Sequence, residues 1–124
     1  MIFRRRKSGK SPESDESETP SSDQAVTIRL RLSDGSFGTD DERQRVLLLE
    51  DQIIEAVDRA GVGAVDGHGF GAGVAELFLD GPDAEALFAA VENLVRAFNP
   101  PTGSTVLLMY GRDDDAQSRT IALG

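Results

Sequence analysis

The stretch between residues 64 and 81 constrains the fold most, because two strand-like runs flank a glycine-rich turn there. Such a pattern is typical of a β-hairpin. Strict alternation along the first run places Asp66, His68 and Phe70 on one face, while Glu76 and Phe78 share a face of the second run. Glycines inside a strand also indicate a bulge or the close approach of a neighbouring backbone. We therefore expect a central hairpin around which the other elements are arranged.

The segment that precedes the hairpin predicts one strand and one helix. Residues 26–32 alternate strictly between apolar and polar side chains, which indicates a strand with one covered face. Thr39 and Glu42 have the spacing of a capping box, so a helix is expected to begin there. Gly61 is expected to end that helix in the left-handed conformation. Phe37, in the turn between the strand and the helix, is expected to fold back over the edge of the core.

The segment that follows the hairpin predicts a second helix and two further strands. Residues 84–98 carry one apolar stripe at helical spacing. Residues 104–110 form an apolar run, and residues 119–123 can return beside it as a short antiparallel strand. The order βαββαβ with a central hairpin is typical of ferredoxin-like folds. We expect an α+β sandwich in which two helices cover one face of a four-stranded antiparallel sheet, with a short extra strand at the C-terminal end.

The first 24 residues are too polar to join this core. Serine, proline and charged residues dominate them, and such a composition buries too little apolar surface to offset the entropy of ordering. We therefore divide the chain into a disordered tail at residues 1–24 and a single domain at residues 25–124.

The face of the sheet that the helices leave open is the predicted site of interaction. Because function in such a fold is expected where side chains remain accessible, polar and aromatic residues on this face are the candidates. They are Arg29, Arg31, Asp66, His68, Phe70, Glu76 and Phe78.

The residue types point to no particular reaction. The chain has no cysteine, which removes disulfides and thiolate chemistry. Its single histidine, His68, supplies at most one nitrogen ligand, so we predict no metal site, no cofactor and no catalytic set. An alternative remains open, in which a small enzyme or a ligand or metal sensor uses the open face around His68.

Charge favours a protein partner. The net charge is −9, and it falls entirely after residue 24, where eight arginines stand against seventeen carboxylates. An acidic domain repels nucleic acid and steers basic proteins towards it. No run reaches the roughly 18 apolar residues of a membrane span, and residues 1–7 do not lead into an apolar signal sequence, so we expect a cytoplasmic protein.

We therefore predict an acidic, non-catalytic protein-binding or regulatory module, of the kind found among immunity proteins and small regulators. It is expected to bind a basic protein through the open face or through the wide apolar arc of the first helix, which Leu47, Leu48 and Ile54 extend. A homodimer formed sheet to sheet is a third hypothesis.

Several motifs resemble those of small uncharacterised bacterial proteins. The run Asp66-Gly-His-Gly-Phe-Gly71, followed by the Gly-Pro-Asp-Ala sequence at residues 81–84, is similar to their Asp-Gly-x-x-Phe-Gly-Gly-Gly and Gly-Pro-Asp-Ala patterns. The resemblance covers residues 26–111 and implies a ferredoxin-like fold, but no assigned activity. This sequence departs from the pattern at Gly69, Ala72 and Val74.

Overall fold

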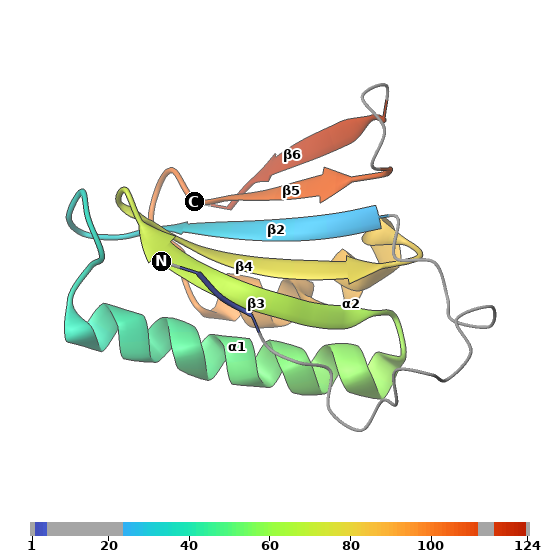
Figure 1. The fold of residues 1–124 in the computed structure, drawn as a ribbon, viewed down its shortest axis with the longest axis horizontal. Coiled ribbons are helices and arrows are strands. Elements are labelled where there is room, and N and C mark those ends of the chain that lie inside the picture. Colours follow the sequence, from blue (N-terminus) through green and yellow to red (C-terminus); the bar gives the residue numbers. More distant parts are fainter. Residues whose placement is uncertain (1, 5–23, 112–115, 124) are drawn as a thin grey trace.

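The computed structural model describes residues 2–4, 24–111 and 116–123, which form an α+β fold of two helices and an open antiparallel sheet (Figure 1). Both helices lie on the same face of the sheet. In chain order the elements are β1 (Ile2–Arg4), β2 (Gln24–Arg31), α1 (Asp40–Ala60), β3 (Ala64–Gly71), β4 (Val74–Gly81), α2 (Ala84–Ala97), β5 (Thr105–Met109) and β6 (Ser118–Ala122).

The sheet runs in the order β1-β3-β4-β2-β5-β6, and every neighbouring pair is antiparallel. The predicted central hairpin is confirmed as β3 and β4, and the predicted C-terminal strand is confirmed as β6, which pairs with β5. The arrangement is consistent with the ferredoxin-like class. It differs from the expectation in strand count, because β1 adds a sixth strand at the edge of β3.

β1 also changes the expected boundary of the tail. Ile2–Arg4 pair with Gly67, His68 and Gly69, so they belong to the sheet. An edge strand presents a row of unpaired backbone groups, and a nearby segment of the same chain can satisfy them. Gln24, which was placed in the tail, is the first residue of β2. The rest of the predicted tail lies outside the described residues.

Each helix has the termini that its sequence predicts. The Thr39 and Glu42 capping box at the start of α1 is present, and Gly61 ends the helix with a φ of 67°. Asp83 caps α2 by accepting hydrogen bonds from the backbone N–H groups of Glu85 and Ala86. Neither of these two helices is long and apolar enough to cross a bilayer, and no other helix occurs in the described part of the chain.

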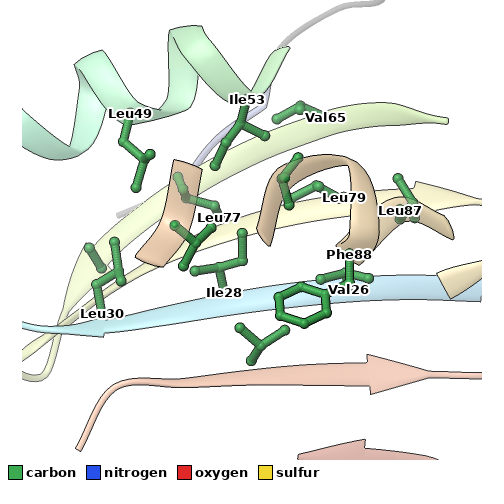
Figure 2. Close-up of a cluster of buried hydrophobic side chains, with 14 of the residues drawn as sticks. Val26, Ile28, Leu30, Leu49, Ile53, Val65, Leu77, Leu79, Leu87 and Phe88 are labelled. Atoms are coloured by element: carbon green, nitrogen blue, oxygen red, sulfur yellow. The ribbon is translucent and has the colours of Figure 1, made fainter. Parts of the chain in front are cut away.

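The hydrophobic core lies between the helices and the sheet (Figure 2). Leu49 and Ile53 from α1, and Leu87 and Phe88 from α2, are buried against it. Burial of such side chains contributes about 1.5–3 kcal/mol each. The sheet supplies Val26, Ile28, Leu30, Val65, Leu77, Leu79, Val106 and Leu108.

Candidate binding site between α1 and β3

A β-bulge in β3 reverses the predicted orientation of the hairpin's aromatic residues. Val65 pairs with Leu79 but Gly67 pairs with Phe78, so Asp66 is an extra residue on this strand. Gly67 has a φ of 154°, which a residue with a side chain rarely adopts. Because the extra residue shifts the alternation by one, His68 and Phe70 join Val65 on the helix-covered face. Their predicted placement on the open face is wrong.

His68 is buried and forms a pair with Glu50 of α1. Its Nδ1 atom lies 2.9 Å from Oε1 and 3.0 Å from Oε2 of Glu50. A carboxylate only accepts hydrogen bonds, so the Nδ1–H group donates to both oxygens. Glu50 is 0% exposed and His68 is 8% exposed. The pair therefore ties α1 to β3 in a region from which water is largely excluded.

A pocket of about 590 Å³ opens beside this pair. The loop before α1, the first half of α1 and the end of β3 supply its walls. The described residues that line it are Phe37, Asp40, Arg43, Gln44, Leu47, His68 and Phe70. The rings of His68 and Phe70 meet edge to face, with their centroids 5.6 Å apart. Its size falls within the usual range for ligand pockets, roughly 300–1,000 Å³.

Phe37 stands at this pocket with 47% of its surface exposed, so the expected closure over the core edge is only partial. The loop that carries it is held firmly. The N–H groups of Ser36 and Gly38 both donate to Asp34 Oδ1 at 2.9 Å. The backbone of Gly73, in the β3–β4 turn, exchanges two further hydrogen bonds of 2.9 Å with Leu32 and Ser36. A large apolar side chain is thus presented to solvent by a loop with several backbone hydrogen bonds.

Charged side chains reinforce this loop. Arg43 donates to the carbonyl oxygens of Phe37 and Gly38 at 3.2 and 2.7 Å, and it also pairs with Asp40. The two hydrogen bonds from Ser36 and Gly38 hold the pKa of Asp34 below its ordinary value. The backbone N–H of Thr39 and the Ser33 hydroxyl likewise lower the pKa of Glu42.

The open face keeps only part of the predicted site. Arg29 and Glu76 face each other on adjacent strands and form an ion pair of 3.1 Å. Phe78, half-buried, lies across from Thr27, whose other neighbour is Leu107 of β5. Arg31 is exposed at the end of β2, and Asp66 is half-buried at the bulge. The predicted residues therefore divide between the two faces of the sheet.

Glu50 is the residue that the sequence analysis missed. The buried face of α1 includes Val46, Ile53 and Val57, and Glu50 lies on the same face, four residues after Val46. A carboxylate within an apolar stripe is a signal that a buried polar partner exists, and the single histidine of the sequence is one candidate for it. Gln44 and Arg43 could not be singled out as pocket residues from the sequence, because polar residues are common on the exposed face of a helix.

Comparisons with protein families, curated proteins and solved structures find no match to this chain. Within the described ranges, no group of three or more His, Asp or Glu side chains is placed to hold a metal ion. The site is therefore interpreted from its own geometry.

Proposed function

We propose that this protein is a non-catalytic binding module that docks a basic protein partner over the pocket between α1 and β3. The observation that carries the proposal is the half-exposed Phe37, carried by a hydrogen-bonded loop beside a pocket whose walls include Leu47 and Phe70. Binding surfaces concentrate their energy in preorganised aromatic residues and the pockets next to them, because little conformational entropy is lost there.

The charge of α1 supports a basic partner. The helix exposes five carboxylates, of which Asp40 pairs with Arg43 and Glu55 pairs with Arg59. The other three are Asp41, Asp51 and Asp58. We name this set of five carboxylates the acidic face. Surface charges of one sign accelerate the encounter with an oppositely charged protein. The pocket would then supply affinity, and the acidic face would supply the rate of association.

The fold and the family resemblance enter this proposal as well. We infer that the domain is ferredoxin-like, supported by the order β3-β4-β2-β5 of its four central strands. We also propose kinship with the small bacterial proteins that its Asp-Gly-x-x-Phe-Gly and Gly-Pro-Asp-Ala motifs resemble. A cytoplasmic location and a regulatory role are parts of the same proposal.

Three exposed apolar side chains allow the docking surface to be tested. Phe37 lies at the pocket, Leu48 on the outer side of α1 and Met109 on the open face; their exposures are 47%, 63% and 38%. Short random peptides displayed on phage are selected against the wild-type protein. The affinity of each enriched peptide is then measured for Phe37→Ala, Leu48→Ala and Met109→Ala.

We expect the enriched peptides to combine an apolar residue with lysine or arginine. Phe37→Ala should weaken them by about tenfold or more, as loss of a central aromatic contact does. Met109→Ala should leave their affinity unchanged. If instead Met109→Ala weakens the peptides and Phe37→Ala does not, the open face is the docking surface and the proposal is wrong.

A further inference from the structure

We infer that the pocket between α1 and β3 accepts an uncharged group with an apolar body and one amide-like polar end. This inference rests on the proposed function and specifies the chemistry of the group that the pocket receives. It follows from the state of the charged side chains around the pocket.

Among the described residues, each charged side chain that lines the pocket is already engaged by another group. Arg43 binds two loop carbonyl oxygens and Asp40, so an anionic ligand would have to compete with the contacts that hold Phe37 in place. The His68 Nδ1–H group is shared between both oxygens of Glu50. A buried ion without a matching partner is strongly disfavoured. An anion or a cation in this pocket would therefore lose hydration without gaining a full ion pair.

Gln44 is the polar side chain at the pocket that suits a neutral ligand. It is exposed on α1, lines the pocket, and makes no side-chain hydrogen bond within the described ranges. Its amide offers one acceptor and two donor positions, which match a carboxamide or a peptide group. Phe37, Leu47 and Phe70 supply the apolar walls against which a ring or an aliphatic chain can pack.

An uncharged anchor in the pocket is compatible with the acidic face of α1. Residues of a basic partner that flank the anchoring side chain would meet the acidic face, whereas the anchor itself would enter the pocket uncharged. Charge would then affect the association rate and its salt dependence, while the anchor would determine the dissociation rate.

Three small molecules of nearly the same shape test the inference. Benzamide is neutral, benzoate is an anion and benzamidinium is a cation. Each is titrated into the full chain, and amide resonances of residues at the pocket are followed by NMR. Gln44→Leu is compared with Gln52→Leu, a matched change at an exposed α1 position that does not line the pocket.

We expect benzamide to shift the pocket resonances and to bind about tenfold or more tightly than either ion. Gln44→Leu should weaken benzamide several-fold, and Gln52→Leu should not. Equal or tighter binding of benzoate or benzamidinium would overturn the inference, and so would the absence of pocket shifts with all three.

The peptide selection separates this inference from the proposed function. Enriched peptides that lose affinity with Phe37→Ala, but whose essential anchor is lysine or arginine, would leave the docking surface standing and refute the neutral anchor. Failure of Phe37→Ala to weaken any peptide would refute the docking surface itself, whatever benzamide does.

Discussion

The two helices cover the same sheet in contrasting ways. α2 is buried through Ala84, Leu87, Phe88, Val91 and Val95, all apolar. α1 buries Glu50 within its apolar stripe, pairs it with His68 of β3, and leaves a pocket beside the pair.

The two seams differ in what it costs to bury their side chains. By a seam we mean the contact between one helix and the sheet. Every apolar group buried in a seam stabilises the fold, whereas the attraction within a buried ionisable pair is largely offset by the cost of removing both groups from water. Where the structure describes it, the seam between α2 and the sheet buries no ionisable pair. Under the proposed function the α1–β3 seam is the part of the domain that binds, and the two seams should respond differently to substitution.

The largest effect is expected at the buried pair. His68→Leu leaves Glu50 in the core without its histidine and should lower the free energy of unfolding by about 3–5 kcal/mol. The double variant Glu50→Leu with His68→Leu should recover most of that loss, because among the described residues neither seam then buries an ionisable side chain. Denaturant unfolding of the three proteins measures this. A double variant no more stable than His68→Leu would show that the pair is not a unit.

If His68 lay exposed on the open face, its substitution would change the free energy of unfolding by no more than about 0.5 kcal/mol. The structure contradicts this surface location, because His68 is only 8% exposed.

Leucine truncations compare the two seams directly. Leu87→Ala opens a cavity in the fully buried α2 seam and should cost about 2–5 kcal/mol. Leu47→Ala should cost less than half as much, since Leu47 is only half-buried and already borders the pocket. Equal losses in denaturant midpoint would mean that the pocket wall is packed as tightly as the rest of the core.

Residues with left-handed backbone conformations should give smaller changes in stability, one in the β3–β4 turn and one at the end of α2. Ala72, in the turn that holds the Phe37 loop, has a φ of 54°, and Asn99, just after α2, has a φ of 63°. Asparagine tolerates this left-handed region better than alanine. Ala72→Asn should therefore raise stability, and Asn99→Ala should lower it, each by roughly 1 kcal/mol. Thermal unfolding of both variants tests the pair, and destabilisation by Ala72→Asn would contradict it.

The smallest effect concerns pH and the loop that carries Phe37. Hydrogen bonds lower the pKa of Asp34 and of Glu42 in the folded protein, so their stabilising contribution is present above the unfolded values. It is lost as the pH falls through the lower folded values, below about pH 4. Amide resonances of Ser36 and Gly38 should shift in this range. Asp34→Asn should remove that shift, and its persistence in the variant would assign it to another group.

Much of the architecture could be predicted from local signals. Three predicted features depend only on neighbours along the chain, and the structure confirms each of them. They are the capping box at Thr39, the left-handed Gly61 and the apolar stripe of α2. The strict alternation of β2 also predicted its buried face, because no bulge interrupts its pairing with β4 or β5.

The candidate site depended on tertiary structure instead. Alternation in β3 holds only until Asp66, where one extra residue turns His68 towards the helices. The glycines indicated either a bulge or the close approach of a neighbouring backbone, and only pairing with β4 places a bulge at Asp66. The pocket, the Glu50–His68 pair and the loop under Phe37 join segments from separate parts of the chain.

What this sequence determined by itself was the order and type of its elements, since helix caps, turns and apolar periodicity act over a few residues. Tertiary structure alone decided which side of the sheet receives His68 and what surrounds Phe37. The physical reason is that a one-residue change in strand register reverses the direction of every side chain after it, and local propensity does not specify that register.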